Sequence, residues 1–177
     1  MSMTGRVWTA GDDINTDLIL PIDIILLPRD QRPRYMFRAN RPGWSAQVTP
    51  GDIMIAGKNF GMGSGRAGAQ VMKDLGIACL VAESINGLFF RNSVNFALPA
   101  LEVPGVLAAF AEGDMAEVDF EAGSVRNVRT GVLMQGSPWP ESMLEILRAG
   151  GLEEQLESKG MLHPKGLRPA PGAVAAA

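Results

Sequence analysis

The chain has 177 residues, of which 46% are hydrophobic and 20% charged, with a formal net charge of −3. This length allows one sizeable core, so we expect a single globular domain, and the lack of a basic stripe argues against nucleic-acid binding. Apolar runs such as 77–82 are interrupted well before the ~20 residues that a membrane-spanning helix needs. The first residues also lack the pattern of a secretory signal, so we expect no membrane association and a cytoplasmic location.

The single cysteine and the single histidine argue against a metal or cluster site held by this chain alone. A cluster takes about three or four thiolates, so any cluster must come from another chain, and we predict no metal ligands here. Cys79 lies in an apolar run and is predicted to be a small buried hydrophobe. His163 opens a segment rich in Pro and Ala, which predicts a domain over 1–162 and a mobile tail over 163–177.

Taken in chain order, the apolar runs alternate between strand and helix patterns. Strands are predicted near 6–8, 52–56, 78–82, 98–103, 116–120 and 124–128. Helices are predicted at 67–75, 85–94 and 106–112, with a further helical segment after Pro140 that is broken at Gly150 and Gly151. The alternation predicts an α/β fold. In the helix over 67–75 the spacing of Val71 and Leu75 places apolar side chains on one face, which we expect to pack on a sheet.

The segment over 29–44 is rich in Arg and Pro and shows no sustained periodicity. It is interpreted as a long loop or a short irregular helix, and long loops of this kind inside compact domains are often functional.

A glycine-rich loop over 57–66 follows the strand predicted to end at Ala56 and opens the next predicted helix. Gly61, Gly63 and Gly65 are expected to allow positive φ angles and close approach of a ligand, while the helix start favours an anion. Ser64 adds a hydroxyl, and Arg66 adds a forked cation suited to a carboxylate. The spacing matches neither a P-loop nor a dinucleotide fingerprint.

This loop, Gly57-Lys58-Asn59-Phe60-Gly61-Met62-Gly63-Ser64-Gly65-Arg66, resembles a signature of the aconitase superfamily. Swivel domains of that superfamily and isopropylmalate dehydratase small subunits usually have G-x-N-F/Y-G-x-G-S-S-R-E-H-A. Three further segments agree in order and spacing, at 11–17, 82–92 and 98–99, and the resemblance covers about 5–156. It implies a swivelling β/β/α domain like the C-terminal domain of aconitase.

The resemblance also implies residue roles. Ser64 matches the serine that, as alkoxide, removes the substrate's proton, and Arg66, with Gly63 and Gly65 beside it, matches the arginine that binds a substrate carboxylate. Asp17 matches an active-site aspartate, with Thr16 as its support. Arg29 is matched to an arginine that contacts the substrate's distal carboxylate, although an ordinary solvated charge is the alternative. Asn59 is interpreted as a backbone brace.

For the whole complex, the resemblance implies a hydro-lyase that is active only with a large subunit carrying a 4Fe–4S cluster. One iron of that cluster acts as a Lewis acid on the substrate's hydroxyl and carboxylate. The expected reaction isomerises 2- and 3-isopropylmalate, small dicarboxylic acids of leucine biosynthesis, through dehydration and rehydration. Homo-oligomers of the isolated chain are left open.

Three departures from the family pattern leave the substrate open: Gly65 replaces a serine, Ala67-Gly68 replace Glu-His, and 23–25 differ from Arg-Tyr-Leu. Another substituted malate or a maleate-type diacid is the first alternative. The apolar run over 24–27 could accommodate an alkyl group, but we interpret it as a buried strand. Two further alternatives are a carboxylate-binding module that has lost catalysis and a nucleotide-binding fold.

Overall fold

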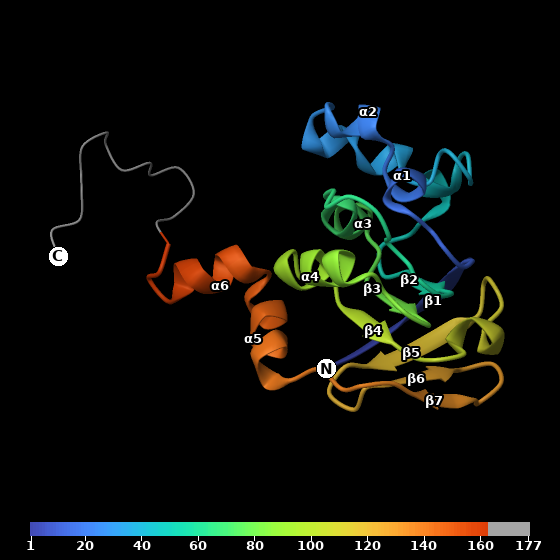
Figure 1. Ribbon diagram of the computed structural model, residues 1–177. Coiled ribbons are helices and arrows are strands. Elements are labelled where there is room, and N and C mark those ends of the chain that lie inside the picture. The colour runs from blue at the N-terminus through green and yellow to red at the C-terminus, as the bar shows by residue number, and fades with distance from the viewer. Residues whose placement is uncertain (163–177) are drawn as a thin grey trace, which may run out of the picture.

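A mixed seven-stranded sheet organises residues 1–162, the part of the chain that the computed structural model describes (Figure 1). The strand order is β4-β3-β2-β1-β5-β6-β7. The parallel half contains β1 (Ser2–Ala10), β2 (Ile53–Ala56), β3 (Cys79–Ala82) and β4 (Ala100–Glu102). The antiparallel half, which pairs with the free side of β1, contains β5 (Met115–Asp119), β6 (Ser124–Asn127) and β7 (Leu133–Gln135). The tail predicted over 163–177, with His163, lies outside the described residues.

The strands β2 and β3 form the centre of the core. Every residue of both strands is buried, as expected for parallel strands covered on both faces. Cys79 is fully buried in β3, and this burial raises the pKa of its thiol. The prediction that Cys79 is a buried hydrophobe is therefore confirmed.

Helices pack beside the parallel half of the sheet. Figure 1 shows α3 (Gly68–Leu75) next to α4 (Gly87–Asn95), and α5 (Glu141–Ala149) and α6 (Leu152–Ser158) contact α4. The short helices α1 (Thr16–Ile19) and α2 (Ile22–Ile25) lie at the far end of α3 from α5. Single 3-10 turns occur at Arg29–Gln31, Pro33–Tyr35, Trp44–Gln47 and Val106–Ala109.

Most of the predicted elements are confirmed, each with small shifts at its ends. All six predicted strands are present, and α3, α4 and the broken C-terminal helix pair lie where the patterns predicted them. In α3, Val71 and Met72 are buried. Gly150 ends α5 with a φ of 95°, which explains the break, because left-handed C-cap positions favour glycine. The irregular segment over 29–44 is also confirmed as loop with 3-10 turns.

Two predicted elements are wrong. The helix predicted over 106–112 is only a single 3-10 turn, Val106–Ala109, which starts after a left-handed Gly105. The strand predicted over 24–27 is absent: Ile24 and Ile25 end helix α2, in which Ile24 alone is buried, and Leu26 and Leu27 follow that helix. The flanking Leu26 is 87% exposed, so the apolar run does not follow the period of a buried strand. Strand β7 was not predicted, because three residues are too few to show alternation.

Candidate active site

The loops that leave β1 and β2 lie side by side, because these two strands are parallel neighbours in the sheet. Three backbone hydrogen bonds join the loops. Asp13 N donates to Lys58 O at 2.9 Å, Gly61 N donates to Ile14 O at 2.7 Å, and Thr16 N donates to Met62 O at 2.8 Å. The pairing of β1 with β2 is thus continued past the ends of both strands. This continuation brings the segment over 11–17 against the glycine loop.

Side chains join the same two loops. The backbone N–H of Lys58 donates to Asp12 Oδ1 at 2.7 Å. Arg66, at the other end of the glycine loop, forms an ion pair with Asp17. Asp17, the predicted active-site aspartate, and Arg66, the predicted carboxylate-binding arginine, are therefore in contact, although 49 positions separate them in the chain.

The loop that follows β3 supports the glycine loop from its other side. Ser84 Oγ accepts a hydrogen bond from the N–H of Asn59 at 2.8 Å. The carbonyl of Ser84 accepts one from the N–H of Phe60 at 3.0 Å. The glycine loop is therefore held between its two neighbours in the sheet, as loops at the carboxyl ends of adjacent parallel strands commonly are.

Two of the three loop glycines have the positive φ angles that the sequence predicted. Gly61 has φ 78°, and a Cβ there would lie 2.3 Å from Phe89 Cγ. Gly63 has φ 115°, and its Cβ would lie 2.7 Å from Thr16 Oγ1. The prediction is wrong for Gly65, which has no positive φ. Gly65 instead lies beside the side chain of Leu88, 3.2 Å from where its Cβ would be.

Ser64 and Arg66 differ in how they are held. Ser64 is exposed, and within residues 1–162 its hydroxyl has no hydrogen-bond partner. The Arg66 side chain is only 12% exposed, and its Nη1 donates both to Asp17 and to Leu20 O, the latter at 3.1 Å. No other group in the described part of the chain bonds to Nε or Nη2 of Arg66. The loop thus carries a free hydroxyl and, two residues later in the chain, an anchored cation whose Nε and Nη2 have no partner among the described residues.

Thr16 packs directly under the loop. Its side chain is 3% exposed, and Oγ1 has no partner among residues 1–162. Because Oγ1 lies where a side chain on Gly63 would be, Thr16 limits how far the loop can sink toward α1. The hydroxyl therefore supports the loop through contact.

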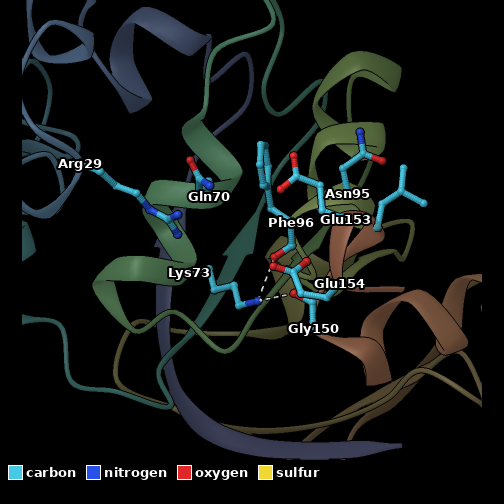
Figure 2. A pocket seen from close by; sticks show the side chains of 9 residues that line it. Arg29, Gln70, Lys73, Asn95, Phe96, Gly150, Glu153 and Glu154 are labelled. Atoms are coloured by element: carbon cyan, nitrogen blue, oxygen red, sulfur yellow. Dashed lines mark hydrogen bonds between the residues drawn. The ribbon is translucent and has the colours of Figure 1, made fainter. Parts of the chain in front are cut away.

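The structure does not bring Arg29 to the glycine loop. Arg29 donates to both carboxylate oxygens of Asp74, at 2.7 and 2.8 Å, and this hydrogen bonding raises the pKa of the Arg29 guanidinium. Asp74 lies at the end of α3 opposite the loop. Arg29 there borders a hollow of about 270 Å³, which Lys73 also lines (Figure 2).

Sequence reasoning did not assign a role to Asp13 or Ser84. Ser84 was noted only as part of a matching segment, and its contribution depends on which strand lies beside β2. Asp13 has a φ of 55°, and Asp is one of the few residues that tolerate this conformation. That preference is a weak sequence signal, because most Asp residues are not left-handed.

Neither a metal site nor a membrane span is found in the described residues. Within residues 1–162, no three side chains of His, Cys, Asp and Glu are grouped so that they could hold a metal ion. None of the helices in the same range combines the length and apolar character needed to cross a bilayer.

Comparison with known proteins adds independent findings. A family model described as the aconitase C-terminal domain matches residues 31–105. The isopropylmalate/citramalate isomerase small subunit of Methanocaldococcus jannaschii is 40% identical over 157 residues, which are 88% of this chain and 94% of that protein. The 3-isopropylmalate dehydratase small subunit of Aquifex aeolicus is 38% identical over 166 residues, covering 90% and 99% of the two chains.

A solved structure shares the fold. The crystal structure of 3-isopropylmalate dehydratase from Methanocaldococcus jannaschii superposes with a TM-score of 0.84 at 27% identity, over 91% of this chain and 96% of that chain. The expected aconitase-like α/β fold in one domain is therefore confirmed.

Proposed function

Because the chain belongs to the family of 3-isopropylmalate dehydratase small subunits, we propose that it pairs with a large subunit to interconvert 2- and 3-isopropylmalate. The observation that carries this proposal is the arrangement of one loop. It presents the free hydroxyl of Ser64 two residues from Arg66, whose guanidinium is anchored but still has free donors.

We assign the proton transfer to Ser64. As an alkoxide, Ser64 Oγ takes a proton from the carbon next to a substrate carboxylate, and the electrons of that C–H bond form a C=C bond. Hydroxide leaves from the neighbouring carbon with the C–O electron pair, which produces an unsaturated diacid. Addition of water in the opposite sense completes the isomerisation. An alkoxide needs nearby positive charge and N–H donors, which Arg66 and the loop backbone can supply.

Arg66 is proposed to bind a substrate carboxylate through Nε and Nη2. Two parallel N–H···O bonds give a planar fork that fixes the carboxylate and hence the carbon beside it. Asp17 and Leu20 O hold Nη1 in place. In this assignment Asp17 orients the guanidinium, and Thr16 and Gly63 set the position of the loop beneath the substrate.

The chain does not fit the ligation of a 4Fe–4S cluster. Such a cluster takes about three or four thiolates, whereas the whole sequence has one cysteine, which is buried in β3. We propose that the cluster belongs to the large subunit, which family membership implies as a partner. When bound there, it would supply Lewis-acid chemistry at the substrate hydroxyl.

Exposed apolar side chains follow closely in the chain after Leu20, the residue whose carbonyl binds Arg66. Helix α2 follows directly after Leu20, whose carbonyl binds Arg66. Ile22 and Leu26, one helical turn apart at the two ends of this segment, are 67% and 87% exposed. We propose that these apolar side chains lie toward the alkyl substituent of the malate. A methyl-substituted malate is the second candidate, since the relative from Methanocaldococcus jannaschii is also named for citramalate.

The test is anaerobic co-expression with the large subunit, followed by an ultraviolet assay for the unsaturated diacid. The panel includes 3-isopropylmalate, citramalate and unsubstituted malate. Ser64→Ala is expected to reduce kcat by about a hundredfold to ten-thousandfold, as loss of a general base typically does. Ser142→Ala, an exposed position on α5, is the matched control. No turnover of any diacid by a complex with an intact cluster would contradict the proposal.

A further inference from the structure

One residue of the glycine loop and one residue of the neighbouring loop after β1 have an unusual backbone and are hydrogen-bonded to each other. Asp13 has φ 55° and Asn59 has φ 57°, and they are two of the four non-glycine residues with positive φ in residues 1–162. Asn59 Nδ2 donates to Asp13 Oδ1 at 3.0 Å. We propose that Asn59 is a positioning residue for Ser64, with Asp13 as its partner, and that the pair sets the height of the glycine loop.

Asn59 makes contacts on three sides. Its backbone N–H donates to Ser84 Oγ at 2.8 Å, and its side-chain amide donates to Asp13 and to Met62 Sδ, the latter at 3.2 Å. These contacts reach the loops after β1 and β3 and also the tip of the glycine loop itself. Asn59 therefore contacts all three loops, beside the backbone hydrogen bonds that also join them.

The left-handed backbone makes this position selective. An ordinary L-residue loses about 1–2 kcal/mol in this region, whereas Asn and Asp tolerate it better. Left-handed residues that are held by surrounding contacts tend to occur at functional sites. Here two such residues are hydrogen-bonded to each other, which indicates that contacts hold the backbone before Ser64 in one conformation.

The location of the pair explains why it would matter for Ser64. The glycine loop has one anchor at Arg66, through Asp17, and a second at Asn59. Between these anchors lie Gly61 and Gly63, whose backbones are the least restrained of any residue type. Backbone hydrogen bonds at Phe60, Gly61 and Met62 also hold this stretch, and the side chain of Asn59 adds the bonds to Asp13 and to Met62 Sδ.

A positioning role differs from a merely structural one in what it affects. Asp13 is exposed and Asn59 half-buried, so their hydrogen bond contributes little to the stability of the whole domain. A shift of about 1 Å at a reacting group, in contrast, can reduce a rate by on the order of a hundredfold. Loss of the pair should therefore change turnover and local order much more than the melting temperature.

The experiment uses Asn59→Gly, Asp13→Gly and the double variant, because glycine adopts the left-handed backbone without strain. Asp13→Gly removes the bond between the two side chains, and Asn59→Gly removes that bond together with the contact to Met62 Sδ. Amide hydrogen exchange over 60–66 is measured on the isolated full chain, and kcat and KM are measured with the large subunit. We expect exchange in this segment to be several-fold faster and kcat to fall about tenfold or more, with KM within about threefold. The double variant should be no worse than Asn59→Gly, since the two residues act as one unit.

Asn95→Ala is the matched control, because Asn95 is exposed at the end of α4. It borders the same hollow as Lys73 of the last turn of α3, at the end of that helix opposite the loop. Asp13→Asn, which keeps an acceptor oxygen, should lose less activity than Asp13→Gly. Unchanged exchange over 60–66 in Asn59→Gly would overturn the inference, as would a loss of kcat matched by faster exchange throughout the chain. The expected change in kcat rests on the proposed function, whereas the expected change in hydrogen exchange does not. If the wild-type complex had no activity, the proposed function would fail, and the exchange measurement would still test the inference about Asn59.

Discussion

Replacing Gly63 with alanine tests whether contact with Thr16 sets the position of the active-site loop. At φ 115° an alanine has a strained backbone, which costs about 1–2 kcal/mol. Its Cβ would also lie 2.7 Å from Thr16 Oγ1, and overpacking of this kind costs about 1–3 kcal/mol when nothing moves. The upper bound is therefore about 5 kcal/mol for a loop that stays in place.

The loop is exposed at Gly63, Ser64 and Gly65, so it can relax by moving outward. We therefore expect the free energy of unfolding to fall by only about 1–2 kcal/mol, because relaxation removes the contact but not the backbone strain. The displaced Ser64 should then lower kcat on the order of a hundredfold. Thermal unfolding of the isolated chain measures the first quantity, and the ultraviolet assay with the large subunit measures the second.

Gly113→Ala is the control for backbone strain alone. Gly113 has φ 90°, and a Cβ there would have no atom within 4 Å. It should cost about the same stability, again about 1–2 kcal/mol, without loss of turnover. Adding Thr16→Ala to Gly63→Ala removes the contact at Oγ1 and should recover part of kcat. If Gly63→Ala and Gly113→Ala have the same turnover, the reasoning about Thr16 is refuted.

Three further predictions concern substrate choice and stability. Gly65→Ser should fold normally, because Gly65 has no positive φ and only the flexible tip of Leu88 is near, at 3.2 Å from the added Cβ. The ratio of kcat/KM for isopropylmalate to that for citramalate should change. A melting temperature several degrees lower would contradict the expectation of normal folding. Lys73→Met should lower the free energy of unfolding by about 1–2 kcal/mol. Lys73 Nζ donates hydrogen bonds to Phe96 O and Gly150 O, at 3.0 and 3.1 Å, where α4 and α5 end (Figure 2). An unchanged midpoint of urea unfolding would contradict this prediction. Burial alone would raise the pKa of Asp52, but hydrogen bonds from Arg6, from the N–H of Thr49 and from Trp8 lower it overall. A lowered pKa means that this carboxylate stabilises the fold above its unfolded pKa of about 3.9 and that the contribution is lost as pH falls through the folded value. Asp52→Asn should therefore cost about 2 kcal/mol near neutral pH and flatten the acid side of the stability curve, as urea titrations between about pH 3 and 7 would show.

The candidate site was partly predictable because some of its requirements are local. Glycine at positions 61 and 63 permits positive φ angles whatever surrounds the loop. The order strand, loop, helix around Ser64 and Arg66 follows from periodicity, and α3 confirms it. Arg29 shows the limit of this reasoning, because its partner Asp74 lies 45 positions away and no local pattern connects them.

The errors have the same origin. The apolar run over 24–27 has the composition of a strand. However, β1 and β2 pair directly with each other, so the sheet has no place for this run between them. The run instead spans the end of helix α2 and the residues after it, and only Ile24 is buried. Apolar composition alone cannot distinguish a buried strand from a short helix with exposed apolar side chains. The extent of burial is decided by which elements are neighbours.

By itself, the amino-acid sequence determined most of the strands and helices, the glycine turn and the presence of Ser64 and Arg66 on one loop, because these depend on residues close together in the chain. Only the tertiary structure decided that Asp13 meets Asn59 and that Asp17 meets Arg66, across 46 and 49 positions. The physical reason is the parallel pairing of β1 with β2, which brings the ends of both strands to the same edge of the sheet. Which strands pair depends on all strands of the chain together, so no single segment of the sequence specifies this pairing.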